Sequence, residues 1–559
     1  MNTNMNITIR RLANAFIILF LILSGIAAYV QIGNQAFFGG PTLVGGDNVT
    51  LSRQCPPVDS PLRGRILDRN GNVIAQSVPD STYRCGYRRQ YADWVISSGL
   101  APLIGYYVLT TNQIGGLEQQ YDEQLGSFNQ GETLGNDVNR LLHQPRFGND
   151  VYLSIDMNTQ IKAAQVYEPS AIHGGQTCQH VDNPPGSIIV EDPNTGQIIA
   201  MVSFPTFDPN QLVQLDSRNA KVHQAGLDYA KQVFSDTSGS PTLNRAAQGV
   251  YTPGSTFKAM TLIAALDSGT YSLDKGFSFD EATKFVVPQG KTVRWEDFFN
   301  GTWTGVPGAN KFPMTLENGF AYSDNAMFAR AASAVGADTW LNYARKFGIL
   351  TGSQGTPVPF DAPTQPSRVY PALVNGKPFE FTGDNLADSG FGQGTLQISP
   401  LTMAEMTATV ATNGFLYEPH VVHKIVPHGQ TASSVLPIPD TQAYSGGPVI
   451  RPESAQAVRN AFWAVTDHGT AFFSVHPGTG VRLKDTGTFI GGKTGTAQVE
   501  DDPHAWYISL APDDQAPGAS GGAQDIIVVQ KEHGNEGACQ VFVANDIYLY
   551  LKNNPIKNS

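Results

Sequence analysis

Residues 249–269 read GVYTPGSTFKAMTLIAALDSG and combine a sharp turn with an apolar segment. Proline and glycine within residues 251–254 interrupt regular structure, and the apolar or small residues 256–266 predict a buried helix. Gly269 is expected to end this helix. Ser255 is therefore expected at the helix N-terminus, where unpaired backbone N–H groups favour a negative charge.

Lys258 lies three positions after Ser255, and residues at this spacing share one helix face. Burial in that apolar face would lower the pKa of the lysine, so that its amine can accept a proton from the serine hydroxyl. The same spacing occurs at Ser272 and Lys275, in a polar stretch beyond the predicted helix, and we interpret that copy as coincidental. Ser255 and Lys258 are therefore the candidate nucleophile and base.

Ser323 and Asn325 form a second candidate cluster within FAYSDNAMFARAA. We expect them at a helix end or in a short loop between helices. A hydroxyl and a carboxamide two positions apart can transfer a proton and hold a peptide amide. The spacing alone is a weak signal, because it recurs at residues 127–129 and 217–219, where helix capping is the simpler explanation.

The segment FIGGKTGTAQ places Lys493, Thr494, Gly495 and Thr496 in a run that predicts a β-strand. An ammonium group and hydroxyls beside a strand can bind a substrate carboxylate. A glycine there lets an extended peptide approach the strand edge. The alternative interpretation is an ordinary glycine bulge. His504 follows shortly afterwards, and we expect it to have a packing role because a lysine already supplies the base.

The chain has 559 residues and a net charge of −12. This length is typical of two or three domains, and the composition is that of a globular protein. Phosphate binding requires clustered lysine and arginine, which the sequence does not contain, so we expect no nucleic-acid partner.

The amino terminus predicts a membrane anchor. Arg10 and Arg11 precede an apolar run at residues 12–30, and no further lysine or arginine occurs before Arg53. A run of about 19 such residues can cross a bilayer. The charge asymmetry places residues 1–11 in the cytoplasm and the rest of the chain outside. The alternative is a cleaved signal peptide, whose apolar region is usually shorter.

The four cysteines are Cys55, Cys85, Cys178 and Cys539, and no C-x-x-C pair suggests a zinc site. Export permits disulfides, and three pairings are possible. If the cysteines are bridged, we expect Cys55 with Cys85 and Cys178 with Cys539, because each pair could stay within one domain. Buried free thiols remain the alternative.

The remaining pattern predicts an α+β fold, in which strands at both ends of the catalytic region enclose helices. Short turns rich in Asp, Asn and Gly separate paired apolar runs, which is typical of β-hairpins. The predicted strands or hairpins are residues 61–77, 187–202, 488–499, 505–510 and 525–529, and the predicted helices are residues 116–125, a segment after residue 155 ending at Ala171, 316–334, 337–347 and 400–413.

The order Ser-x-x-Lys, Ser-x-Asn and Lys-Thr-Gly is that of class A β-lactamases and penicillin-binding proteins. The chain resembles a class B, monofunctional penicillin-binding protein of the short actinobacterial elongation or division type, over nearly its whole length. The segments that carry the resemblance are RGRILDRNG at residues 63–71, GLEQQYDEQL at 116–125, DPNTGQIIAMVSFPTFDPN at 192–210, GQGTLQISPLTMA at 392–404 and HAWYISLAP at 504–512.

The resemblance implies the penicillin-binding transpeptidase fold, a β-lactamase-like antiparallel sheet flanked by helices, in residues 151–559. It also implies a non-catalytic, β-rich pedestal or dimerisation-like module in residues 31–150, which follows the single transmembrane helix in the sequence. The protein would be a single-pass cell-membrane protein with its catalytic domain outside the cytoplasm.

The resemblance further implies a D-alanyl-D-alanine transpeptidase that acts on peptidoglycan stem peptides and is inhibited by β-lactams. Ser255 would attack the penultimate D-Ala carbonyl and pass its proton to Lys258. Backbone N–H groups of Ser255 and Thr496 would form the oxyanion hole. No metal or other cofactor is implied.

The other motif residues would complete the site of such an enzyme. Ser323 would relay a proton to the leaving D-Ala, and Asn325 would hold the substrate amide. Lys493 would keep Ser323 in place electrostatically. Thr494 and Thr496 would bind the terminal carboxylate, with Gly495 between them.

Two other classes share parts of this pattern. A β-lactamase or D,D-carboxypeptidase would use the same three clusters and pass the acyl group to water, but it needs neither the anchor nor the first module. A non-catalytic scaffold would be expected to lack a motif residue. Residues 31–150 are too few for a glycosyltransferase, so the resemblance implies a polytopic membrane glycosyltransferase as partner. A role in elongation or in division stays open.

Overall fold

The computed structural model describes residues 55, 61–111, 113–126, 147–167, 172–173, 176–178, 184–236, 239–288, 290–295, 298–299, 302–303, 311–428, 444, 446–476, 478–499 and 502–556. The predicted cytoplasmic tail and anchor at residues 1–30 lie outside this part of the chain. Among the described residues, none of the helices has the length and apolar character that crossing a bilayer requires.

The centre of the molecule is a five-stranded antiparallel sheet in the order β10-β9-β25-β24-β23. The early hairpin and the carboxyl-terminal strands therefore form one sheet, as the sequence predicted, and β23 lies at its edge. The bounds are β9 Gly186–Asp192, β10 Gln197–Phe204, β23 Gly491–Ala497, β24 His504–Ala511 and β25 Asp525–Lys531.

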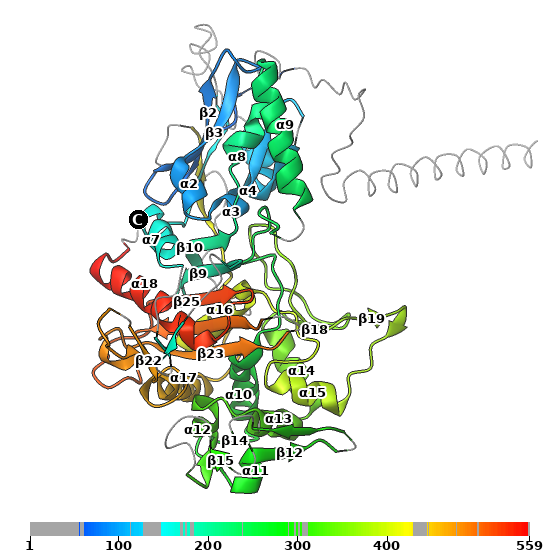
Figure 1. Ribbon diagram of the computed structural model, residues 1–559, viewed down its shortest axis with the longest axis vertical. Coiled ribbons are helices and arrows are strands. Elements are labelled where there is room, and N and C mark those ends of the chain that lie inside the picture. Colours follow the sequence, from blue (N-terminus) through cyan, green and yellow to red (C-terminus); the bar gives the residue numbers. More distant parts are fainter. Residues whose placement is uncertain are drawn as a thin grey trace, which may run out of the picture.

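Helices pack against this sheet, whose strands are buried along most of their length. A sheet with that burial needs cover on both faces. This cover comes from α7 (Met157–Gln165), α16 (Pro400–Ala411), α17 (Pro452–Asp467) and α18 (Val541–Asn553). The turn η2 (Gly254–Phe257) packs against β23, and α10 (Lys258–Asp267), which follows it, packs against α17. Figure 1 shows the sheet in the middle of the molecule and α11–α13 at the lower end of the molecule. The α+β class predicted from the sequence is confirmed.

A second five-stranded sheet lies at the upper end of Figure 1 and has the order β21-β6-β1-β2-β3. Its amino-terminal strands β1 (Ile66–Leu67) and β2 (Val73–Pro79) form the hairpin predicted around residues 68–71. β3 (Tyr87–Tyr91) follows, and β6 (Asp150–Leu153) and β21 (Val422–Val426) complete the sheet from later in the chain. The β-rich character expected for the amino-terminal region is confirmed.

Buried charges connect the two amino-terminal motifs. Glu118 in α4 (Gly116–Gln120) accepts hydrogen bonds from the guanidinium groups of Arg63 and Arg89 and from the Tyr91 hydroxyl. The Glu118 side chain is fully buried. Burial acts to raise the pKa of Glu118, but the two arginines lower it by more. Arg63 and Glu118 thus hold the segments RGRILDRNG and GLEQQYDEQL together.

Both expected disulfides are present. Cys55 is bonded to Cys85, and Cys178 is bonded to Cys539, so the alternative of free thiols is wrong. The second bond joins the segment after β8 (Gln176–Thr177) to the 3₁₀ helix η4 (Gly537–Gln540).

Three predicted helices differ from the structure. The helix expected at residues 116–125 is two short helices, α4 and α5 (Asp122–Gly126), separated by Tyr121. The helix expected to continue to Ala171 ends at Gln165, and Ala171 itself lies outside the described residues. The helix expected at residues 316–334 is two helices, α12 (Leu316–Ala321) and α13 (Asn325–Val335). Ser323 breaks the helix because its backbone is left-handed, with φ of 64°.

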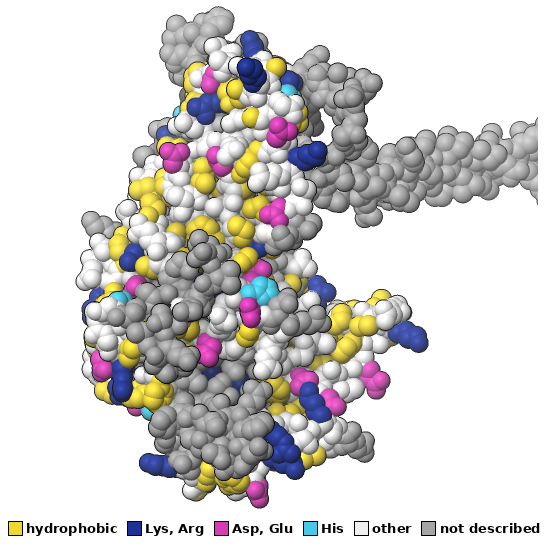
Figure 2. All heavy atoms as spheres, viewed as in Figure 1, with side chains coloured by type: hydrophobic (Ala, Val, Ile, Leu, Met, Phe, Trp, Pro, Cys, Tyr) yellow, Lys and Arg dark blue, Asp and Glu magenta, His cyan; other side chains and the backbone are white. Residues whose placement is uncertain are grey.

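The hairpin of β19 (Leu373–Val374) and β20 (Lys377–Pro378) projects from the body beside α14 (Figure 1). Leu373 is 59% exposed, and the arm stands out in Figure 2 with apolar and basic side chains. The other elements are α2 Asp93–Ser97, α3 Ala101–Ile104, β4 Tyr106–Val108, β5 Gln113–Gly115, α5 Asp122–Gly126, β7 Ile172–His173, α8 Pro209–Val213, η1 Gln214–Asp216, α9 Ala220–Ser235, η2 Gly254–Phe257, β11 Gly276–Phe277, α11 Phe279–Thr283, β12 Lys284–Val286, β13 Thr292–Arg294, β14 Phe298–Phe299, β15 Thr302–Trp303, β16 Met314–Thr315, α14 Ala337–Lys346, β17 Leu350–Thr351, β18 Arg368–Tyr370, α15 Gly383–Gly390, β22 Ser474–Val475 and η3 Leu483–Asp485.

Candidate active site

Ser255 lies in η2, a 3₁₀ turn that leads directly into α10. The α-helix itself begins at Lys258, two residues later than the predicted start at residue 256. Gly254 has φ of 55°, and a Cβ on it would lie 2.8 Å from the Thr496 carbonyl carbon. A Cβ on Gly392 would collide with the Gly254 carbonyl oxygen. The turn is therefore held between β23 and the segment around Gly392, which sets the direction of the serine.

Lys258 contacts three other residues of the site. Its Nζ lies 2.6 Å from Ser255 Oγ, 2.7 Å from Asn325 Oδ1 and 3.3 Å from Ser323 Oγ. The side chain is fully buried, as the apolar sequence of α10 predicted. The structure thus brings together four of the predicted site residues, although the Ser255 and Asn325 positions are 70 residues apart in the sequence.

The short connection between α12 and α13 directs the side chains of Ser323 and Asn325 toward Lys258. Asp324 caps α13, because its Oδ1 accepts a 3.0 Å hydrogen bond from the Met327 backbone N–H. Asn325 is the first residue of α13, and Ser323 has the left-handed backbone described above. The expectation of a loop between helices is confirmed.

Lys493 reaches the same group from the edge strand β23. Its Nζ donates to Ser323 Oγ at 3.0 Å and to the Thr494 carbonyl oxygen at 2.9 Å. Burial, and then the positive charge of Lys258, hold the pKa of Lys493 well below its usual value. Ser323 is consequently the shared hydrogen-bond partner of two buried lysines, and a proton can pass between them through its hydroxyl.

The three residues after Lys493 have different surroundings. Thr494 Oγ1 lies 2.6 Å from Thr470 Oγ1. Thr496 is exposed, so its hydroxyl is accessible to a ligand. A Cβ on Gly495 would lie 2.8 Å from Thr256 Cγ2 and 2.9 Å from Thr256 N. Glycine is therefore required here for close approach to the Ser255 turn.

Sequence reasoning did not single out Thr470, which follows α17 and hydrogen-bonds Thr494. No distinctive pattern marks it, because its position depends on the packing of α17 against β23. Phe391 was also missed, and its ring lies 6.0 Å from Lys258 Nζ.

His504 lies edge-on to Tyr251, and its Nδ1 accepts a hydrogen bond from the His533 backbone N–H. Burial lowers the pKa of His504, with a further contribution from His533. These contacts are those of the packing role that we expected. Trp506 donates a 3.1 Å hydrogen bond to the Thr252 carbonyl oxygen, which supports the turn before Ser255.

The other copies of the Ser-x-x-Lys and Ser-x-Asn spacings are not part of this site. Lys275 is exposed, and its Nζ donates to the neighbouring Gly276 carbonyl oxygen. Asn219 caps α9. Residues 127–129 lie outside the described residues. The two copies within the described residues therefore agree with the interpretations of coincidence and of helix capping.

Comparison with known proteins matches residues 186–519 to the penicillin binding protein transpeptidase domain family. Peptidoglycan D,D-transpeptidase PbpA of Mycolicibacterium smegmatis is 30% identical over 525 residues, 91% of this chain and 91% of the relative. Peptidoglycan D,D-transpeptidase MrdA of Acinetobacter baumannii is 29% identical over 480 residues, 80% of this chain and 62% of the relative.

A solved structure has the same fold. The imipenem acyl-enzyme complex of penicillin-binding protein A from M. tuberculosis aligns with a TM-score of 0.67 at 24% identity, covering 87% of this chain and 98% of that chain.

Proposed function

The chain belongs to the class B penicillin-binding protein transpeptidases, and from this premise we infer that it is a peptidoglycan D,D-transpeptidase that β-lactams acylate. Such an enzyme crosslinks cell-wall stem peptides through an acyl-serine intermediate. The observation that carries this conclusion is the 2.6 Å contact between Lys258 Nζ and Ser255 Oγ, inside a network that also contains Ser323, Asn325 and Lys493.

Ser255 is the proposed nucleophile. Its Oγ attacks the carbonyl carbon of the penultimate D-Ala while its proton moves to a neutral Lys258 amine. An ester to Ser255 forms when the bond to the terminal D-Ala breaks. The close approach of Gly254 to Thr496 supports an oxyanion hole made by the backbone N–H groups of Ser255 and Thr496, where one lost donor costs about 3 to 4 kcal/mol.

Ser323 is proposed to return the proton to the leaving amine of D-Ala. It is suited to this because its Oγ contacts both Lys258 and Lys493. Asn325 directs Oδ1 at Lys258, which leaves its amide N–H₂ for a substrate carbonyl. The amine of a second stem peptide then attacks the ester, and Ser255 regains its proton as the crosslink forms.

The edge strand β23 is the proposed substrate strand. An extended peptide can pair with an open strand edge, and the Thr494 and Thr496 hydroxyls would take its terminal carboxylate. Gly495 contributes by letting β23 approach the Ser255 turn.

We propose that residues 31–150 form a non-catalytic pedestal, anchored by a transmembrane helix at residues 12–30, with residues 151–559 as the extracytoplasmic transpeptidase domain. The strands β1, β2 and β3 support this role, and β6 and β21, which come from later in the chain, join their sheet to the rest of the molecule. The partner would be a polytopic membrane glycosyltransferase. Co-purification from detergent that is lost on deleting residues 12–150 would support the partnership, and unchanged recovery would count against it.

A fluorescent penicillin tests the enzymatic assignment. We expect it to label the wild type and Ser272→Ala, and to leave Ser255→Ala unlabelled. With stem pentapeptide and an amine acceptor, the wild type should form crosslinked dimers. Labelling of Ser255→Ala, or release of D-Ala without any dimer, would overturn the transpeptidase assignment.

A further inference from the structure

A cavity of about 650 Å³ lies where the amino-terminal sheet meets the end of the central sheet. This volume is typical of ligand sites. Its walls include Arg69 in the β1–β2 turn, Asp525 at the start of β25, and Leu551 and Lys552 in α18. None of the residues that surround Ser255 lines it, so the cavity is separate from the candidate active site.

Arg69 is an exception among the buried arginines of the described chain. The other four, which are Arg63, Arg89, Arg245 and Arg459, each form an ion pair with a carboxylate. Arg69 is only 6% exposed, yet it has no such partner among the described residues. Its guanidinium makes two long 3.4 Å hydrogen bonds, to the Ser154 carbonyl oxygen and to Gln197 Oε1.

A buried guanidinium with no carboxylate in direct contact is unfavourable, because the lost hydration is not fully replaced. Burial lowers the pKa of Arg69 by more than Asp156, Asp192 and Asp68 raise it, and each of these aspartates stays outside ion-pair distance. A carboxylate in the cavity would supply two charge-assisted hydrogen bonds in the planar geometry that arginine prefers. Lys552 lies at the rim, where its Nζ donates to the Gly487 carbonyl oxygen and keeps further protons for a ligand.

Asp525 is a carboxyl group of the cavity wall that has no basic partner among the described residues. No described residue donates a hydrogen bond to its carboxyl group or pairs with it. Burial, and then Asp192, raise the pKa of Asp525 to about 7. Asp192 uses its own carboxylate within the β9–β10 turn, where it accepts from Asn194 N and Thr195 Oγ1. An ammonium group in the cavity would pair with Asp525 in its ionised form.

We propose that this cavity binds a short zwitterionic peptide, with its carboxylate on Arg69 and its ammonium on Asp525. Apolar side chains of the peptide would contact Phe489 and Leu551, which also line the cavity. Arg69 belongs to the amino-terminal sheet region and Asp525 to the central sheet. The bound peptide therefore connects the two sheets.

The probe is the tripeptide Ala-Leu-Ala, with its N-acetylated and C-amidated forms, titrated calorimetrically into the full-length protein in detergent. The free tripeptide should bind, and each cap should weaken binding about tenfold or more because it removes one charged contact. Equal binding of the capped and free peptides, or no binding of the free peptide at millimolar concentration, would overturn the proposal.

Two variants locate the contacts. Arg69→Gln should bind the free and the amidated peptides equally and still bind the acetylated peptide more weakly. Asp525→Asn should bind the free and the acetylated peptides equally and still bind the amidated peptide more weakly. The exposed Arg294→Gln is the matched control and should behave like the wild type. Penicillin labelling reports whether each variant is folded. If Arg69→Gln fails to fold, Asp525→Asn alone tests the proposal. Binding of the acetylated peptide that is still weaker than that of the free peptide in Asp525→Asn would contradict the site.

Discussion

At the scale of single residues, the chemistry depends on two lysines that share one serine. Lys258 and Lys493 are both fully buried, and both contact Ser323 Oγ. Their mutual repulsion adds to the effect of burial in lowering the pKa of Lys493. A lowered pKa makes it easier for Lys493 to give up its proton, and Ser323 Oγ is the group that contacts both lysines. The proposed relay through Ser323 follows from this geometry.

Thr470 gives a prediction at the same scale. Thr470→Val removes the hydroxyl that orients Thr494 and keeps the side-chain volume. We expect the second-order rate of penicillin acylation to fall by up to about tenfold, as is usual for one hydrogen bond. KM for a stem peptide should rise more than kcat falls. The measurement is stopped-flow labelling together with steady-state kinetics.

Thr470→Ser is the matched control, because it retains the hydroxyl and should acylate at nearly the wild-type rate. Acylation of Thr470→Val at the wild-type rate would show that Thr470 does not position Thr494.

At the scale of secondary structure elements, β23 and the turn η2 are in close contact. Gly495→Ala would place a Cβ 2.8 Å from Thr256 Cγ2 and push the strand away from Ser255. A displacement of about 1 Å can cost on the order of a hundredfold in rate. We therefore expect slow labelling by penicillin with little change in the melting temperature. Gly522→Ala, where a Cβ meets open space, should label normally. Normal labelling of Gly495→Ala would contradict the argument.

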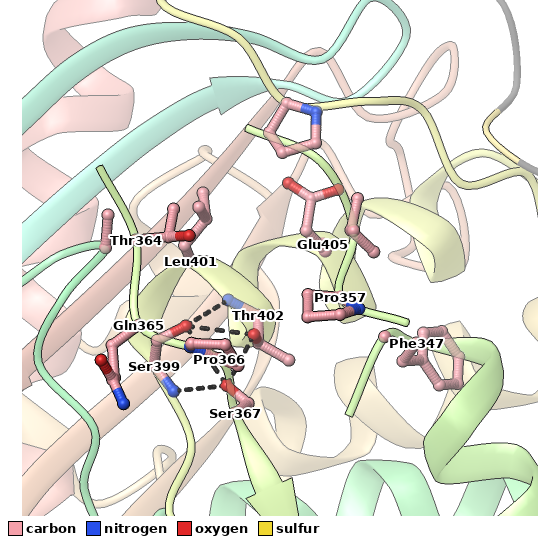
Figure 3. A pocket seen from close by; sticks show the side chains of 14 residues that line it. Phe347, Pro357, Thr364, Gln365, Pro366, Ser367, Ser399, Leu401, Thr402 and Glu405 are labelled. Atoms are coloured by element: carbon pink, nitrogen blue, oxygen red, sulfur yellow. Dashed lines mark hydrogen bonds between the residues drawn. The ribbon is translucent and has the colours of Figure 1, made fainter. Parts of the chain in front are cut away.

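Helix α16 buries Glu405 near Glu191 of β9. Glu405 lines a cavity of about 30 Å³, and Figure 3 shows its carboxyl group away from the cluster of Ser367, Ser399 and Thr402. Neither glutamate has a hydrogen-bond partner among the described residues. Burial, and then Asp192, raise the pKa of Glu191 to about 8. Burial, and then Glu191, raise the pKa of Glu405 well above its usual value.

These raised pKa values predict the pH dependence of stability. Between the unfolded pKa of 4.5 and the folded value of about 8, the folded state binds more protons than the unfolded state. The free energy of unfolding therefore falls as the pH rises through this window. Glu405→Gln carries no titratable proton and should flatten the decline in melting temperature between about pH 5 and about pH 8.

The exposed Glu453→Gln serves as the control and should keep the wild-type pH profile. Parallel profiles for Glu405→Gln and the wild type would show that the buried pair is not responsible.

At the scale of the whole molecule, the Cys178–Cys539 bond closes a loop with a sequence separation of 361 residues. It tethers η4, whose Gly537 N–H donates a 3.4 Å hydrogen bond to Thr496 Oγ1 of β23. Replacing both cysteines by serine should lower the free energy of unfolding by about 2 to 5 kcal/mol and slow acylation. The measurements are denaturant unfolding and penicillin labelling.

The second disulfide supplies the comparison. Cys55 and Cys85 are only 30 positions apart and lie outside the central sheet, so replacing them should leave the acylation rate unchanged. Equal effects of the two double replacements on acylation would contradict a role for η4 at β23.

Much of the fold was predictable because its signals are local. The hairpins at residues 68–71 and 192–196 follow from their turn residues, and the α10 segment follows from its apolar run. The break at Ser323 was harder to predict as a structure, because the residues on both sides have helical patterns. A left-handed serine there is maintained by the packing of α12 and α13.

The pairing of Ser255 with Lys258 followed from the sequence, because helix geometry brings side chains three positions apart onto one face. The meeting of Lys493 with Ser323 was implied by the family resemblance and by no local pattern. The hydrogen bond between Thr470 and Thr494, and the burial of Arg69 without an ion pair, emerged only from the tertiary structure. These contacts join residues that are distant in the chain. Their distances are set by how sheets and helices pack, and no local sequence pattern encodes that packing.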